Sequence, residues 1–316
     1  MGGLTRALGG RLVQAALVAL LVGIACFAMV EFLPGDQAYR IAAGRYGEDL
    51  VSTAAADAVR LELGLDRPWW ERLGAWLAAL ARLDLGVSLV TGERVAHEIG
   101  HQLGHTLLLS LAALALSVLL GPPLGVLAAA RAGTAWDLAG MSAAAALRAL
   151  PAFAVGVALT WIFAVRLGLL PAAGAEGPAA AVLPALTLAL GLAAASSRVT
   201  RDVALSVMRS PWVAFARTKG LGEAAVVRRH ALRNAAAPVT AYLGIQLAWL
   251  VEGVVVVESV FVWPGIGHAL VHAVVARDVP MIQGTALVLG LLFVLLNALV
   301  DLLCILIDPR AGERRR

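Results

Sequence analysis

The sequence predicts an all-α membrane protein that crosses the bilayer six times. Of its 316 residues, 60% are apolar and 15% are charged, and the mean hydropathy is +0.85. Soluble domains carry about 25% charged residues, and disordered chains combine low hydrophobicity with high charge. Six apolar runs are each long enough to span a bilayer, which needs about 20 residues. The cores of soluble proteins do not supply six such runs.

We expect transmembrane helices near residues 11–33, 104–130, 137–165, 179–199, 236–258 and 281–307. Four prolines lie within these spans, where they bend a helix without excluding it from the membrane: Pro122, Pro123, Pro151 and Pro184. The first span follows two arginines, as the apolar region of a signal peptide does, but it is longer, and no small-residue cleavage site follows it. We therefore expect it to remain as an anchor.

Basic residues predict that both termini are cytoplasmic. They concentrate at the N-terminus, in the loop 198–233 and at the C-terminus, whereas the short outer loops contain only Arg166 and Arg277. Lysine and arginine favour the cytoplasmic side of a membrane. The net charge of +4 is too small to indicate a nucleic-acid partner. The two cysteines lie in apolar runs and indicate neither a disulfide nor a zinc framework.

The chain is expected to divide into four parts. Residues 1–33 form the N-terminus and first span, and residues 34–103 form an extracytoplasmic loop. Within that loop, Ala54–Leu63 and Pro68–Leu83 have the apolar spacing of helices, which predicts a small helical cap. Residues 104–308 form a core of five spans, which includes the cytoplasmic loop 198–235. Residues 309–316 form a basic tail.

The cytoplasmic loop 198–235 has a pattern of its own. Ser210 and Pro211 predict a helix start with a hydroxyl cap, and Trp212, Phe215 and Ala216 supply a short apolar face. Gly220 suits a left-handed helix stop, and a second helix is expected over Gly222–Arg233. Two interpretations fit this helix pair: an amphipathic element lying on anionic lipid, or a site where another protein docks.

Two segments of this loop resemble the EAA loop of permease subunits of ATP-binding-cassette importers. They are Phe215-Ala-Arg-Thr-Lys-Gly-Leu-Gly-Glu223 and Arg229-His-Ala-Leu-Arg-Asn-Ala-Ala-Ala-Pro238. Within that family the chain is similar to the dipeptide, oligopeptide and nickel group. The resemblance extends over nearly the whole chain, through residues 33–36, 63–68, 84–88, 121–126, 255–267, 276–280 and 301–310.

The resemblance implies a type I importer permease that translocates peptides, nickel or metal chelates across the inner membrane. It implies a pore shared with a second homologous permease, two ATPase subunits beneath, and an extracytoplasmic substrate-binding protein. The helix near 211–219 would couple the pore to an ATPase through Trp212, Ala214, Phe215, Ala216, Gly220 and Leu221. Ala214 departs from the family, which has an acidic residue there.

The chain is expected to catalyse no reaction and to hold no cofactor. A nucleotide-binding P-loop needs a lysine followed by Ser or Thr, but the sole lysine, Lys219, is followed by glycine. ATP and magnesium therefore belong to the ATPase partners. A secondary transporter is an alternative class, but its inverted repeats are absent from the sequence and it has no use for a docking loop.

His97-Glu98-Ile-Gly-His101 supports another alternative, an integral-membrane zinc metalloprotease, because two histidines four apart share a helix face and can hold zinc, with the glutamate as general base. No third acidic ligand follows at a clear spacing. A milder hypothesis is that outer histidines gather a metal at the pore mouth, against the simpler interpretation that they are polar helix ends. These residues are His97, His101, His105, His268 and His272.

Arg148 and Glu252 are expected to line the translocation path. Each is a charge inside an apolar span, and such charges are costly unless they pair or face water. Their expected depths differ by less than about 10 Å at a rise of ~1.5 Å per residue. We therefore expect an ion pair between them or a joint contact with a zwitterionic cargo. Glu258 is expected to be structural.

Overall fold

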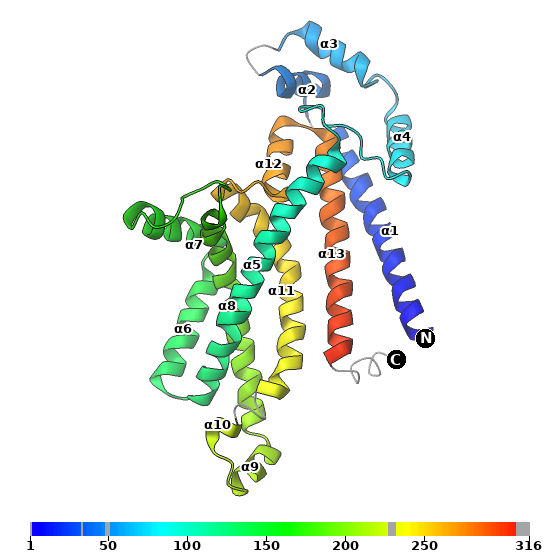
Figure 1. Ribbon diagram of the computed structural model, residues 1–316. Coiled ribbons are helices and arrows are strands. Elements are labelled where there is room, and N and C mark those ends of the chain that lie inside the picture. Colours follow the sequence, from blue (N-terminus) through cyan, green and yellow to red (C-terminus); the bar gives the residue numbers. More distant parts are fainter. Residues whose placement is uncertain (1, 33, 48–50, 227–231, 308–316) are drawn as a thin grey trace. The chain divides into compact units, whose positions relative to one another are not determined.

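The computed structural model describes residues 2–32, 34–47, 51–226 and 232–307, and these are mainly helical with no β-strand (Figure 1). The all-α fold class is therefore confirmed. The helices are α1 (Gly2–Glu31), α2 (Gln37–Tyr46), α3 (Thr53–Glu62), α4 (Trp69–Ala81), α5 (Val95–Ala130), α6 (Ala135–Ala149), α7 (Ala152–Leu159), the π-helix η2 (Thr160–Arg166), the 3-10 helix η3 (Pro178–Ala181), α8 (Val182–Met208), α9 (Pro211–Thr218), α10 (Glu223–Val226), α11 (Leu232–Phe261), α12 (Ile266–Ala276) and α13 (Val279–Ile307).

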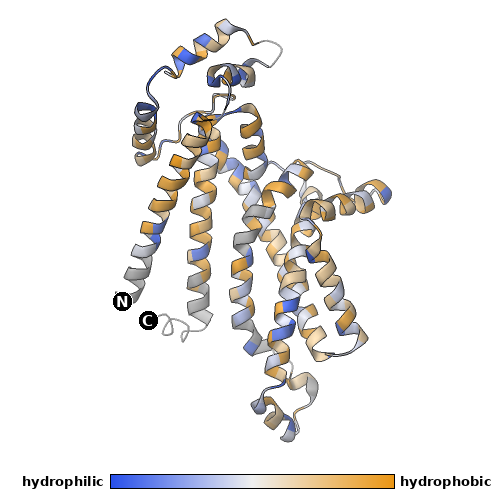
Figure 2. Ribbon diagram, turned by 180° about the vertical axis from the view of Figure 1, so that it is seen from behind, coloured by the Kyte–Doolittle hydropathy of each residue, from blue (hydrophilic) through white to orange (hydrophobic). Residues whose placement is uncertain are grey.

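Among the described residues, four helices are individually long and apolar enough to cross a membrane. They are Gly9–Glu31 within α1, α5, Pro178–Met208, and Val279–Val300 within α13. Two further pairs of apolar helices are each sharply bent at a short break, and the number of candidate spans rises to six if each pair is counted as one span. This agrees with a polytopic membrane protein. Figure 2 shows hydrophobic residues along α13, whereas hydrophilic residues gather in α2 and α3.

The third predicted span is broken rather than bent. α6 ends at Ala149, and the segment that follows it, Ala152–Arg166, turns by 105°. The break lies at Leu150, whose φ of −81° and ψ of 135° are extended. The ring of Pro151 disfavours the helical conformation for the residue before it, so one proline here ends the helix.

The fourth span is longer than the sequence predicts. α8 continues through residues 198–208, which the sequence analysis places in a loop. No helix breaker occurs until Ser210, whose ψ of 149° is extended because Pro211 follows it. The part of the chain that leads out of this span is therefore a rigid helix, and the connection that remains is short.

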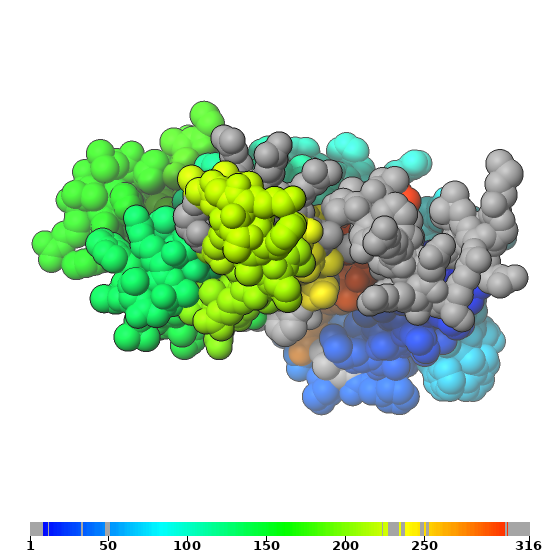
Figure 3. All heavy atoms as spheres, turned by 90° about the horizontal axis from the view of Figure 1, so that it is seen from below, coloured from blue at the N-terminus to red at the C-terminus, as the bar shows by residue number. Residues whose placement is uncertain are grey.

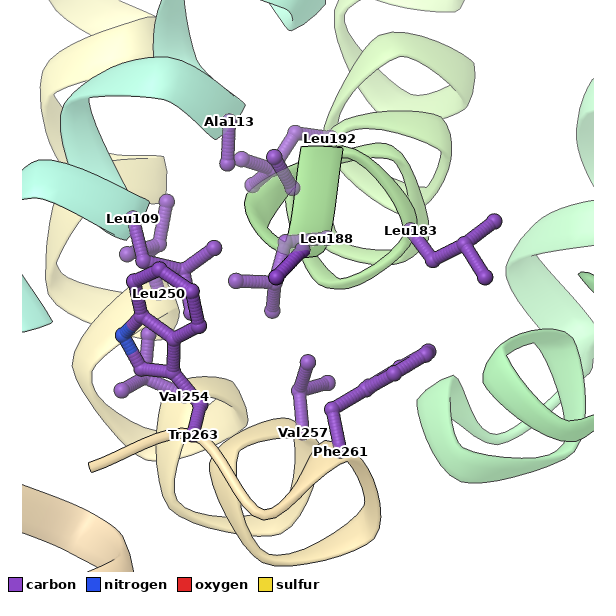
Figure 4. Packing of buried hydrophobic residues seen from close by; sticks show 12 residues of the cluster. Leu109, Ala113, Leu183, Leu188, Leu192, Leu250, Val254, Val257, Phe261 and Trp263 are labelled. Atoms are coloured by element: carbon purple, nitrogen blue, oxygen red, sulfur yellow. The ribbon is translucent and has the colours of Figure 1, made fainter. Parts of the chain in front are cut away.

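The chain forms two compact units, residues 1–106 with 264–295, and residues 107–263 with 296–316. In the second unit α8 is the most enclosed of the candidate spans, with 61% of its apolar window buried. It packs against α6, α7 and α11. Figure 4 shows the side chains that fill this core, which include Leu109, Leu188, Leu192, Leu250, Val254, Val257 and Phe261.

Small residues allow α5 to approach α8 at backbone distance. A Cβ atom on Gly121 would lie 2.8 Å from the carbonyl oxygen of Ala193, and one on Gly125 would overlap the carbonyl oxygen of Ser197. Glycines four apart on one helix face are a common device for close packing in membranes, where the hydrophobic effect does not drive helices together. These two glycines therefore fix the separation of α5 from α8.

In the first unit, α2 and α3 pack through a small core of Ala38, Ile41, Ala42, Ala56 and Val59. α3 and α4 correspond to the two predicted helices, whereas α2 was not predicted. Asp36 caps α2, since its carboxylate accepts a hydrogen bond of 2.9 Å from the amide of Ala38. Arg45 donates to Glu62 of α3 at 2.7 Å, and this hydrogen bond lowers the pKa of the Glu62 carboxyl.

Buried Asp278 joins two distant segments of the first unit. Its carboxylate accepts hydrogen bonds from the hydroxyl of Ser88 and, at 3.1 Å, from the amide of Leu89. It also accepts from the amide of Met281 in the first turn of α13. The carboxylate therefore ties the non-helical segment of residues 84–94 to the start of a candidate span.

The close approach of α5 and α8 leads to the first prediction. Gly125→Ala should lower the free energy of unfolding by about 1–3 kcal/mol, because the new methyl group forces two helix backbones apart. Gly191→Ala is the matched control, since nothing lies within 4 Å of a Cβ atom there and alanine favours a helix. Thermal unfolding in nanodiscs, followed by tryptophan fluorescence, measures both. Equal melting temperatures for the two variants would contradict the packing.

Candidate functional site

The candidate site is the end of α8 together with α9 and α10, which project from the second unit (Figure 1). α8 packs against α9, and α9 packs against α10. One valine of each short helix is fully buried, Val213 in α9 and Val226 in α10. Figure 3 shows the two helices as a rounded group of atoms in yellow-green.

A bidentate ion pair holds the base of this protrusion. Arg201 of α8 donates through Nε and Nη2 to the two carboxylate oxygens of Asp137 in α6, at 2.6 and 2.7 Å. Asp137 is buried and also accepts a hydrogen bond of 2.9 Å from the amide of Gly133. Paired, parallel hydrogen bonds fix orientation as well as distance. The last turns of α8 are therefore tied to the start of α6.

A cavity of about 550 Å³ lies beside this ion pair. One face of α6 supplies an apolar wall of Leu138, Met141 and Ala145. The facing wall carries Arg201, already paired, and its charged neighbours, Arg198 and Asp202. The cavity therefore combines an apolar wall with a charged one.

The start of α9 differs from the sequence prediction in one detail. Ser210 occupies the N-cap position, but its hydroxyl makes no cap hydrogen bond. It donates instead to the carbonyl oxygen of Val207 at 2.5 Å. Pro211 at the first helical position lacks an amide proton and presets φ, so the helix begins without a side-chain cap.

The end of α9 is a Schellman turn centred on Gly220. The amide of Leu221 donates to the carbonyl of Ala216, and that of Gly220 donates to the carbonyl of Arg217. The φ of Gly220 is +88°, in the region that L-residues avoid. The predicted left-handed stop is therefore confirmed. α10 then begins at Glu223, and the rest of the predicted second helix includes residues 227–231, outside the described residues.

The outer face of α9 is apolar and accessible. Trp212 is 44% exposed and Phe215 is 61% exposed, and Ala214 between them is exposed as well. The ammonium of Lys219 lies 4.6 Å from the centre of the Phe215 ring. Two large exposed aromatic side chains on one short helix are typical of an interaction surface.

The structure does not test whether the two predicted translocation residues, Arg148 and Glu252, contact each other. Arg148 lies exposed in the last turn of α6, and the side chain of Glu252 in α11 lies outside the described residues. Their pairing stays a prediction. Glu258, expected to be structural, is fully buried.

Four of the five histidines of the metal hypothesis lie in two pairs. The rings of His101 and His105 lie 5.1 Å apart, and those of His268 and His272 lie 4.5 Å apart. In the part of the chain that the structure describes, no three His, Cys, Asp or Glu residues are placed to hold a metal ion. Glu98, in the first turn of α5, accepts a hydrogen bond from the hydroxyl of Thr91. The carboxylate between His97 and His101 is therefore engaged at a helix start.

Two anchoring carboxylates were missed by the sequence analysis. Asp137 and Asp278 each join segments that lie far apart in the chain. The only available signal was that each aspartate lies next to an apolar span, where a buried charge needs a partner.

Comparison with known proteins places the chain among transport permeases. Residues 121–313 match the model of the family described as binding-protein-dependent transport system inner membrane component. The glutathione transport system permease protein GsiC of Pectobacterium atrosepticum is 39% identical over 290 residues, covering 92% of this chain and 93% of that protein. A putative peptide transport system permease protein of Brucella suis is 38% identical over 308 residues, covering 95% and 96%.

The ion pair at the base of α9 yields the second prediction. Asp137→Asn and Arg201→Gln should each lower the free energy of unfolding by about 1–3 kcal/mol, since each leaves a charged partner poorly satisfied. Arg198→Gln, an exposed neighbour on the same helix, should change it little. In the double variant the loss should be smaller than the sum by more than about 0.5 kcal/mol. Strictly additive losses in a thermal-unfolding cycle would contradict the pairing.

Proposed function

The chain belongs to the family of binding-protein-dependent transport system inner membrane components, and we propose that it forms the pore for small peptides. Within that family it is a permease of the peptide group of ATP-binding-cassette importers. The family accounts for a multi-pass chain without a nucleotide-binding motif of its own. It also implies ATPase and substrate-binding partners. We propose a second permease subunit and two ATPase subunits as the complete assembly.

The proposed cargo is a short peptide or a peptide-like thiol such as glutathione. The support is the printed function of two relatives that cover more than nine-tenths of this chain, one a glutathione permease and one a peptide permease. We propose these in preference to nickel or a metal chelate, because neither relative is named for a metal.

We propose that α9 transmits conformational change between an ATPase subunit and the pore. A short helix that follows a long buried span can transmit such a movement only if its connection to that span is rigid. Here α8 is held by the core and by the Arg201–Asp137 pair. The apolar face of Trp212 and Phe215 would enter a groove of an ATPase subunit, with Ala214, Ala216, Gly220 and Leu221 shaping the contact. Ala214 offers no charge, so recognition would rest on shape and apolar contact.

We propose that both termini and the α9–α10 protrusion lie in the cytoplasm. The short segments on that side carry most of the chain's arginines, whereas Arg166 and Arg277 are the basic residues of the short segments on the other side. This orientation places α9 where ATP is available. It places α2, α3 and α4 outside, where a substrate-binding protein delivers cargo.

The observation that carries the coupling proposal is the left-handed turn at Gly220. Gly220→Val should reduce peptide uptake per ATP hydrolysed several-fold, because a β-branched residue at this φ costs at least about 1–2 kcal/mol and distorts the end of α9. Gly220→Asn should retain coupling, since asparagine tolerates the left-handed region. Uptake of glutathione and ATP hydrolysis are measured together in proteoliposomes that contain the full complex and its binding protein.

Gly222→Val is the matched control for this experiment. Gly222 lies two residues away, its φ is outside the left-handed region, and nothing lies within 4 Å of a Cβ atom there. Uptake per ATP should therefore stay near that of the unchanged protein. Unaltered coupling in Gly220→Val, or equal losses in both variants, would contradict a role for this turn.

A further inference from the structure

α4 is an apolar helix that buries none of its residues. Only Glu71 and Arg72 of its 13 residues are charged, and its sequence includes Trp69, Trp70 and Trp76. Trp69 is 48% exposed and Trp70 is 60% exposed. Leaving this much aromatic surface in water is costly, because burial of apolar area is worth about 25 cal/mol per Å². The described residues do not cover this surface, so its surroundings must.

Two contacts fix where α4 lies. Arg72 forms an ion pair of 2.5 Å with Glu31 at the end of α1. The ring of Trp76, one turn further along, packs so closely on Gly23 of α1 that a Cβ atom there would lie 2.6 Å from Cζ3. Gly23 lies about 12 Å along α1 from Glu31 at ~1.5 Å per residue. Because α1 spans the membrane, α4 runs beside the last turns of a span rather than above them (Figure 1).

The chain after α4 turns back and is anchored again. Leu83, two residues after the end of α4, has a left-handed conformation with a φ of 60° and is 86% exposed. The chain then returns to Ser88, which buried Asp278 holds at the start of α13. Residues 72–88 therefore form a short excursion, fixed at both ends next to candidate spans, with a bare leucine at its turning point.

We propose that α4 is an interfacial helix that inserts into the leaflet at the C-terminal end of α1, with lipid as the partner that covers its exposed face. Under the proposed orientation this is the outer leaflet. Tryptophan is the residue that proteins concentrate at the headgroup level of a bilayer. Arg67, exposed just before the helix, complements the phosphate groups of the lipids.

The surroundings of α4 favour lipid over a protein partner. It lies against α1, and only 6% of the apolar window of α1 is buried within the chain. The exposed face of α4 therefore continues a surface that already faces lipid. Arg82 and Asp84 at the turning point limit its depth, because charged groups are costly in the hydrocarbon region. The helix thus lies at the boundary of the bilayer and does not cross it.

The test compares two alanines that are both exposed, Ala78 on α4 and Ala58 on α3. Each is replaced by cysteine in a cysteine-free background and labelled with an environment-sensitive fluorophore. The complete complex is placed in nanodiscs of phosphatidylethanolamine and phosphatidylglycerol, with or without lipids that carry a nitroxide near the headgroup. Lipid nitroxide should quench the label at residue 78 several-fold more than the label at residue 58.

Two results would overturn the proposal. Equal, weak quenching with a water-like emission at both positions would mean that α4 is solvated. A water-protected label at residue 78 that lipid nitroxide does not quench would mean that a protein covers it.

A second variant separates insertion from local misfolding. Gly23→Val should expel the Trp76 ring and reduce lipid quenching at residue 78. Gly10→Val in the same helix has nothing within 4 Å of its Cβ atom and should leave the quenching unchanged. Equal quenching in the two variants would contradict anchoring of α4 on α1.

Discussion

The contact of α5 with the backbone of α8 is the constraint on which the second unit depends. Inside a bilayer, lipid tails are as apolar as leucine, so helices associate through close packing. Gly121 and Gly125 let the α5 backbone reach α8, and Ser196, Ser197 and Thr200 on the facing side are small enough to permit it. With α8 held on this face by α5 and elsewhere by α6, α7 and α11, its last turns can extend past the apolar core without losing their direction.

At the ends of the spans, buried carboxylates hold the neighbouring segments in place. Asp137 with Arg201 secures the exit of α8, and Asp278 with Ser88 secures the entry of α13. Each carboxylate is buried, and each accepts hydrogen bonds from a backbone amide as well as from a side chain. Such groups are stable only when fully satisfied, so they specify one arrangement of the segments they join. The protrusion of α9 and α10 follows the first of these anchors, and the excursion of α4 ends at the second.

The sequence predicted local features well and long-range pairings poorly. The stop at Gly220 and the helices α3, α4 and α9 follow from turn residues and apolar spacing over a few positions. The break at Pro151 appeared only as a kink, because the sequence does not say whether neighbouring helices will carry the chain through a bend. α2 escaped prediction since its apolar residues are mostly alanines, whose weak periodicity hides a buried face.

The candidate site shows the same division. Its exposed aromatics and its glycine turn were predicted from the sequence. The ion pair that supports it joins residues 64 positions apart, and no local pattern identifies the partner of Asp137. Ser210 was predicted from its residue type to cap α9 through its hydroxyl. The hydroxyl instead donates a hydrogen bond to the carbonyl of Val207 in the preceding helix. The pairing of Arg148 with Glu252 rested on depth alone and stays a prediction.

We propose that α9 carries force between this chain and an ATPase subunit. The most direct measurement places a photo-cross-linking amino acid at Phe215 and, as a control in the same unit, at exposed Leu167 beyond η2. In membranes that contain the full complex, Phe215 should cross-link to an ATPase subunit and Leu167 should not. Cross-linking of Phe215 to lipid alone, in an assembled complex that hydrolyses ATP, would contradict the account.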